Sequence, residues 1–204
     1  MRNIHSQESG RSMVEMLGVL AIIGVLSVGG IAGYSQAMNK FKVTKTTDQI
    51  QTLVTNIRTL TSAQRNYKLV DNAGLLYKLG GLSDEMCTGT CANSTLINPY
   101  GGPVKIRSLG NANKQFAIAY DGLPAAACVS LATQAWGDNA SGLAAVVAGT
   151  AVDTSTAAPS STDTTGTMST SDITGADGKT NPMSLEAASI GCGSSLGAVT
   201  FFYK

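Results

Sequence analysis

Few residues in this chain have the type and the spacing that a catalytic, metal-binding or processing site requires. The most distinctive are Gly10 and Glu15, which stand five residues apart at the start of a long apolar segment. From Met16 to Tyr34 that segment carries no charged side chain. As an α-helix, its 19 residues would span about 28 Å, close to the hydrocarbon thickness of a bilayer. Glu15 therefore lies at the edge of a predicted membrane-spanning helix.

The chain has little of what a catalytic or metal site needs. Its single histidine, His5, lies near the N-terminus, so no other imidazole is available for a Ser-His, Cys-His or zinc site. The carboxylates are scattered singly, apart from the adjacent Asp84 and Glu85. No glycine-rich phosphate-binding loop follows a predicted strand. We therefore expect no enzyme activity, no metal and no cofactor.

Four cysteines form a second group of residues that could bind a metal or form disulfides. A zinc site built from all four would need two closely spaced pairs, and only Cys87 and Cys91 are spaced in that way. Four cysteines allow three disulfide pairings, and disulfides are usual outside the cytoplasm. Because the predicted membrane anchor places the rest of the chain outside, we expect the pairs Cys87–Cys91 and Cys128–Cys192.

The apolar segment allows three interpretations. A secretory signal peptide has an apolar core of about 7–15 residues, which is shorter than this segment. A plain signal anchor explains the length but gives Gly10 and Glu15 no role. The third interpretation uses both residues. Gly10, four further residues, Glu15 and about 20 apolar residues resemble the class III signal of type IV prepilins.

That resemblance implies a processing step. In the family, prepilin peptidase cuts after the glycine and N-methylates the new first residue, and the apolar helix becomes the core of a filament. By resemblance, residues 1–10 are a leader, cleavage separates Gly10 from Arg11, and Arg11 is methylated. Glu15 would form the assembly salt bridge. Arg11 departs from the family pattern, which usually has Phe, Met or another apolar residue there.

A second pattern follows the apolar segment directly. Residues 35–67 contain no proline or glycine, and Ile50, Leu53 and Ile57 recur at helical spacing. This predicts one helix over residues 11–67, with a membrane-spanning half (11–34) and an amphipathic half (35–67). A separate core helix after a loop is the alternative.

The charges that flank the apolar segment favour the opposite orientation. Lys40, Lys42 and Lys45 follow it and outnumber Arg2 and Arg11 before it, which by the positive-inside rule would place the rest of the chain in the cytoplasm. The peptidase motif and the expected disulfides both place it outside. We follow these two agreeing indications.

Residues 68–204 are expected to form a globular head. A turn-rich stretch from Leu69 to Pro103, with a short helix near 75–79, precedes two alternating runs that predict an antiparallel strand pair. A helix is expected to open at 121–124 and to end near Trp136, and a strand to close the chain at 198–203. Residues 143–148 could form a strand or a helix.

The head adds a more specific resemblance. Residues 114–118, residues 121–123 and Cys128 together resemble the toxin-coregulated type of pilin, in the type IVb class. In that type the corresponding cysteine bonds to one near the C-terminus, which implies Cys128–Cys192 and a disulfide-bounded region 128–192. Residues 150–174, rich in Ser, Thr and Ala, would be a flexible surface loop or a variable, glycosylated face of the filament.

These observations predict an α+β type IV pilin fold, with a long N-terminal helix packed on an antiparallel sheet. The predicted function is structural: a major pilin, inserted in the inner membrane and polymerised by the pilus assembly machinery into an extracellular homopolymer (a fimbrium). Adhesion, aggregation or DNA uptake would be the filament's task. A net charge of +1 without a basic patch argues against nucleic acid as a primary partner. The alternatives are a minor pilin, a type II secretion pseudopilin, or an anchored periplasmic binding module that never polymerises.

Overall fold

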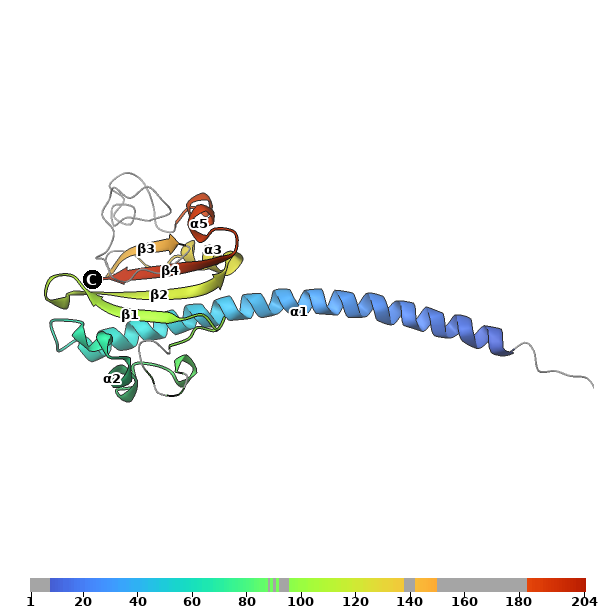
Figure 1. Ribbon diagram of the computed structural model, residues 1–204, viewed down its shortest axis with the longest axis horizontal. Helices are drawn as coiled ribbons and strands as arrows, with labels where there is room; N and C mark the ends of the chain where they lie inside the picture. Colours follow the sequence, from blue (N-terminus) through green and yellow to red (C-terminus); the bar gives the residue numbers. More distant parts are fainter. Residues whose placement is uncertain (1–7, 88, 90, 92–95, 138–141, 150–182) are drawn as a thin grey trace, which may run out of the picture. The chain divides into compact units, whose positions relative to one another are not determined.

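The structure is a computed structural model that describes residues 8–87, 89, 91, 96–137, 142–149 and 183–204. Its first element is one long helix. For residues 8–12 and 111 the backbone alone is described. The helix, α1 (Glu8–Thr61), continues without interruption from the apolar segment into the amphipathic one (Figure 1). The chain divides into two compact units, residues 1–41 and residues 42–204.

The helix ends earlier than the predicted end at Tyr67. After Thr61 the backbone turns, because the amide of Gln64 donates to the carbonyl of Thr61 in place of the helical partner. Thr and Ser hydroxyls compete for carbonyls at this end, since Thr61 Oγ1 donates to Ile57 and Ser62 Oγ to Thr59. A short 3₁₀ turn, η1 (Lys68–Asp71), and a short helix, α2 (Ala73–Lys78), follow, the latter near the expected position.

Within the described residues, four strands form one antiparallel sheet in the order β1-β2-β4-β3. The strands are β1 (Val104–Leu109), β2 (Gln115–Pro124), β3 (Leu143–Gly149) and β4 (Leu196–Tyr203). The expected antiparallel pair is present, with Ile106 opposite Ile118. The undecided run 143–148 is a strand, which lies at the edge of the sheet beside β4.

The second half of α1 packs against one face of this sheet. Ile50, Leu53 and Ile57 are buried in one cluster with apolar side chains from all four strands. Near the end of the helix, the Arg58 guanidinium lies 5.2 Å from the ring centre of Tyr203, and Tyr203 stacks on Phe116 at 5.1 Å. These contacts fix the helix to the two central strands.

The helix predicted to open at 121–124 begins later. Strand β2 continues to Pro124, with a register shift between Tyr120 and Leu123 where Gly122 has a φ of 68°. Pro124 is the N-cap of the helix, α3 (Ala125–Ala132), which ends before the expected end at Trp136. A further helix, α5 (Leu185–Cys192), is not among those predicted from the sequence. Residues 150–174 lie outside the described residues.

The buried tyrosines of the core predict how the head responds to alkali. Burial raises the pKa of Tyr203 to about 12, with the Arg58 cation opposing the shift, and burial also raises the pKa of Tyr120. Because the folded pKa of Tyr203 lies above its unfolded value, its neutral form contributes stability below pH 10, and this is lost as the pH rises toward 12. The loss should be on the order of 2–3 kcal/mol. Urea unfolding at pH 9, 10.5 and 12 measures it, and a Tyr203→Phe variant with an equally steep decline would contradict this assignment.

Candidate assembly site

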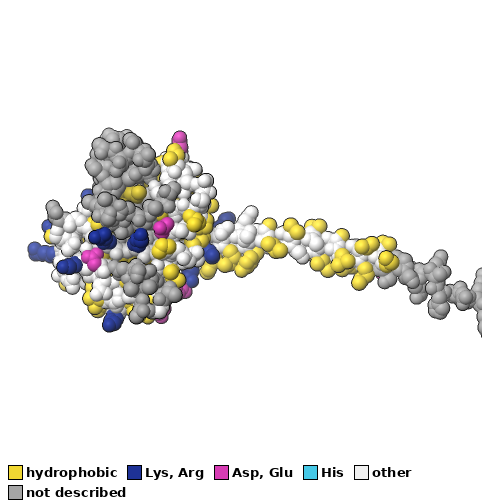
Figure 2. Space-filling view, in the orientation of Figure 1, with side chains coloured by type: hydrophobic (Ala, Val, Ile, Leu, Met, Phe, Trp, Pro, Cys, Tyr) yellow, Lys and Arg dark blue, Asp and Glu magenta, His cyan; other side chains and the backbone are white. Residues whose placement is uncertain are grey.

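The N-terminal half of α1 exposes an apolar surface. From Met13 to Tyr34 its large apolar side chains are between 52% and 75% exposed within the subunit. Figure 2 shows hydrophobic side chains along this length of helix. A stretch of this helix has a mean hydropathy of 2.2 and is long and apolar enough to cross a membrane. Nothing in the described part of the subunit covers this surface, so its partner must be lipid or another molecule.

Glu15 is the charged residue on this surface. It is exposed, and the described residues offer it no ion-pair partner. A carboxylate beside apolar surface is unfavourable in a lipid environment unless a cation meets it. The backbones of Gly10 and Arg11 lie in α1, one turn before Glu15, but their side chains are outside the described residues.

Glycines interrupt the apolar surface without a reason inside the subunit. A Cβ added at any of them would meet no atom within 4 Å: Gly18, Gly24, Gly29, Gly30 and Gly33. Glycine costs roughly 1 kcal/mol relative to alanine in a helix interior. Their use therefore lies outside the subunit, and glycine in such helices permits close approach of a neighbouring backbone.

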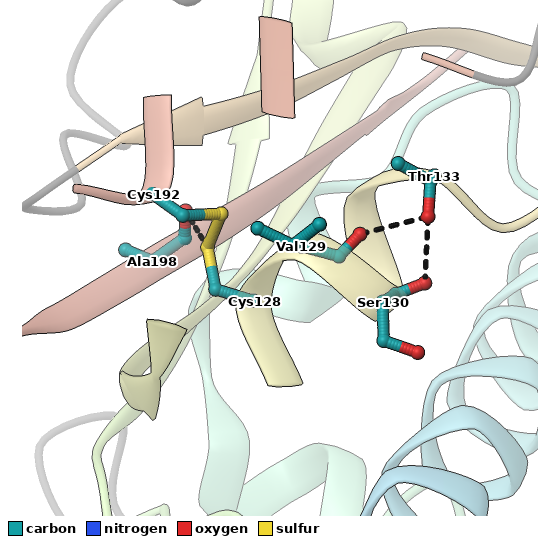
Figure 3. The surroundings of a disulfide bond; sticks show 6 residues. All are labelled: Cys128, Val129, Ser130, Thr133, Cys192 and Ala198. Atoms are coloured by element: carbon teal, nitrogen blue, oxygen red, sulfur yellow. Dashed lines mark hydrogen bonds between the residues drawn. A yellow bond between two sulfur atoms is a disulfide. The ribbon is translucent and has the colours of Figure 1, made fainter. Parts of the chain in front are cut away.

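The head is closed by a buried disulfide. Cys128 in α3 bonds to Cys192 at the end of α5, with 5.8 Å between the two Cα atoms and neither residue exposed (Figure 3). Strand β4 passes directly beneath it, and Cys128 Sγ lies 3.7 Å from the carbonyl oxygen of Ala198. Gly197 makes this approach possible, because a Cβ there would lie 2.7 Å from the same sulfur.

A second disulfide lies in the turn-rich segment before the sheet. Cys87 bonds to Cys91, with 5.1 Å between their Cα atoms. Cys87 follows the 3₁₀ turn η2 (Asp84–Met86) and pairs with Leu96 in an isolated bridge. Both disulfides have the pairing expected from the sequence.

The described residues contain no group of three or more His, Cys, Asp or Glu side chains that could bind a metal ion. The sequence-predicted residues therefore fall into two separate places: Gly10, Arg11 and Glu15 on the first unit, and the disulfides on the second. Sequence reasoning missed the role of Gly197, which only the path of β4 under the disulfide reveals.

Comparisons with known proteins agree with this arrangement. The family profile described as PilS N terminal matches residues 30–187. The major structural subunit of the bundle-forming pilus of Escherichia coli O127:H6 is 29% identical over 146 residues, which cover 70% of this chain and 72% of that protein. The toxin coregulated pilin of Vibrio cholerae is 30% identical over 62% of this chain and 57% of its own length.

Among solved structures, the type IVb pilin from Salmonella typhi aligns with a TM-score of 0.49 and 19% identity, covering 79% of this chain and 98% of that one. The match to the family covers more than half of the chain, and it includes the second half of α1, strands β1, β2 and β3, and α3. The chain belongs to the PilS family of type IV pilins and is a structural pilin subunit.

Proposed function

We propose that this pilin is a major subunit whose leader, residues 1–10, is removed by prepilin peptidase between Gly10 and Arg11, and whose new first residue, Arg11, is N-methylated. The spacing of Gly10, Glu15 and the apolar segment supports this step. The mature helix holds the subunit in the inner membrane until the pilus assembly machinery transfers it to the filament. The head, residues 68–204, follows the helix and includes the disulfide-bounded region 128–192.

The observation that carries the proposal is Glu15, a charge that has no partner among the described residues and lies on an otherwise apolar surface. Cleavage after Gly10 would create the cation that it lacks, the α-amine of Arg11. Within one helix that amine lies about 6 Å away along the axis, so an internal pair is conceivable. In assembly the amine of one subunit pairs with Glu15 of its neighbour, which neutralises both charges as the apolar helices leave lipid and pack together.

The first of these relatives is named for the bundle-forming pilus of which it is a subunit, and the other is named for its regulation together with a toxin. For this chain we propose an extracellular filament that serves adhesion or aggregation of cells. Its exposed apolar helix requires burial among other subunits once it has left the bilayer. The alternative of an anchored binding module that never polymerises would leave Glu15 and the helix glycines without use.

A Gly10→Val variant tests the processing step. A bulky side chain at the scissile position should exclude the chain from the peptidase, so the subunit should keep residues 1–10 and remain in the membrane. The N-terminus is measured by mass spectrometry of the membrane fraction, with Gly18→Val, an open position on the same helix, as the matched control. A Gly10→Val subunit that begins at Arg11 would remove the basis for this step.

A further inference from the structure

A pocket of about 230 Å³ lies between α1 and the segment around η2. Its apolar wall includes Leu53 and Met86, both almost fully buried. Polar groups of α1 and η2 surround this wall: Lys45, Asp48, Gln49 and Glu85. The site lies wholly within the unit formed by residues 42–204.

The pocket lining includes one unused hydrogen-bond acceptor among the described residues. Gln49 Oε1 is buried and accepts no hydrogen bond from the described residues. A buried acceptor without a donor costs about 1–3 kcal/mol, so a group that donates to it would be favoured. Lys45 Nζ already pairs with Glu85 at 2.7 Å, whereas the exposed Asp48 forms no ion pair within the described part of the chain. The pocket therefore suits a donor with positive charge.

A lysine or arginine side chain meets these requirements. Its aliphatic stem can lie against Leu53 and Met86 while its cationic head donates to Gln49 Oε1 and faces Asp48. A neutral apolar side chain would leave the Gln49 acceptor unpaired. An acidic side chain would meet Asp48 and Glu85.

The other end of the head carries such side chains. The amide of Tyr67 donates to the carbonyl of Asn113 at 2.7 Å, which joins the turn after α1 to the β1–β2 turn, at the same end of the head in Figure 1. Three basic residues flank this bond and are exposed: Arg65, Lys68 and Lys114. None forms an ion pair with any residue that the structure describes. We call these three residues the basic end.

We propose that a side chain of the basic end of one subunit enters the Gln49 pocket of a second copy. Gln49 and Thr61, the last residue of α1, are about 18 Å apart along the helix axis, and the basic end lies past that end of the helix, so one head cannot close this contact on itself. A contact between two different surfaces of identical copies is heterologous and, when it does not close into a ring, generates a helical filament. The proposal rests on the proposed function and adds a head-to-head contact to the pairing at Glu15.

Zero-length cross-linking with a carbodiimide tests the contact in filaments sheared from cells. The reagent joins a carboxylate to an amine only when they touch, and the Lys45–Glu85 pair within each subunit serves as an internal positive control. We expect a peptide that joins Asp48 to Lys68 or Lys114. The distance along α1 makes any such peptide intersubunit.

Arg65 does not react with the carbodiimide, so charge exchange tests whether it is the partner. Asp48→Lys should reduce filament number about tenfold or more, and reversal of the correct basic residue (Arg65→Glu, Lys68→Glu or Lys114→Glu) in the same chain should restore it. Lys105→Glu, an exposed charge on the outer side of β1, is the matched control. Gln49→Leu should lower filament number without lowering the unfolding free energy of the subunit.

The outcomes separate the two proposals. If the wild-type chain makes no filaments, the proposed function fails. If filaments form, the absence of cross-links from Asp48 to the basic end, together with normal filament number in Asp48→Lys or no rescue by any reversal, overturns the pocket contact and leaves the proposed function intact.

Discussion

Replacing Glu15 with alanine should leave a processed subunit in the membrane and reduce the number of filaments at least about tenfold. The carboxylate costs up to a few kcal/mol near the bilayer interior unless a cation meets it, and each 1.4 kcal/mol corresponds to about a factor of ten in an equilibrium. Loss of Glu15 removes the group that would draw the incoming α-amine of Arg11 to the filament. The amine would then enter the apolar filament core without a partner.

Electron microscopy of whole cells counts the filaments, and mass spectrometry of the membrane fraction checks that the subunit is processed. Glu186→Ala is the matched control, because Glu186 is an exposed carboxylate on α5 of the head. If Glu15 merely reaches toward the membrane interface, its neutral replacement should be harmless. Normal filament number in Glu15→Ala would thus refute the assembly role, although the helix could still be an anchor.

Cys192→Ser should have the second largest effect. Cys128 and Cys192 are separated by 64 residues, and closing so long a loop stabilises a domain by roughly 4 kcal/mol on the chain-entropy model. The substitution would also leave a hydroxyl and a free thiol between α3, α5 and strand β4, where both cysteines are fully buried. We expect a loss of about 2–5 kcal/mol in unfolding free energy and little stable subunit outside the membrane.

Cys87→Ser provides the comparison, because that disulfide closes a separation of only four residues, which the same model values at about 2 kcal/mol. Urea unfolding of the purified subunits measures both losses, and immunoblotting measures abundance. Equal unfolding free energies of the two variants would show that closing the long loop does not determine the stability of the head. Non-reducing peptide mapping that joins Cys87 to Cys192 would contradict the pairing itself.

Local patterns made much of this fold predictable from the sequence. The absence of helix breakers between residues 35 and 61 is a property of adjacent residues, and so is the alternation of Val104, Lys105 and Ile106 in β1. The Gly10–Glu15 spacing is equally local. The end of α1 was misplaced because Tyr67 belongs to a turn that is fixed by Asn113, a residue distant in sequence.

Helix α5 is not predicted from the sequence, and the structure gives the physical reason. Its apolar residues Leu185 and Ile190 are exposed, so they do not follow the buried stripe that reveals a helix on a core. It also contains Gly191, which sequence rules count against a helix. The structure explains this glycine, since a Cβ there would lie 2.6 Å from the carbonyl oxygen of Ala148 in β3. The Gln49 pocket is likewise invisible in the sequence, because it exists only where the segment around η2 lies against α1.

The central claim is that this chain becomes the subunit of a filament through its own processed helix. Intact mass spectrometry of subunits from sheared extracellular filaments of wild-type cells tests it most directly. The account predicts a chain that begins at Arg11, carries one N-methyl group and contains two disulfides. A full-length chain with residues 1–10 attached, found only in the membrane fraction of cells without filaments, would contradict it.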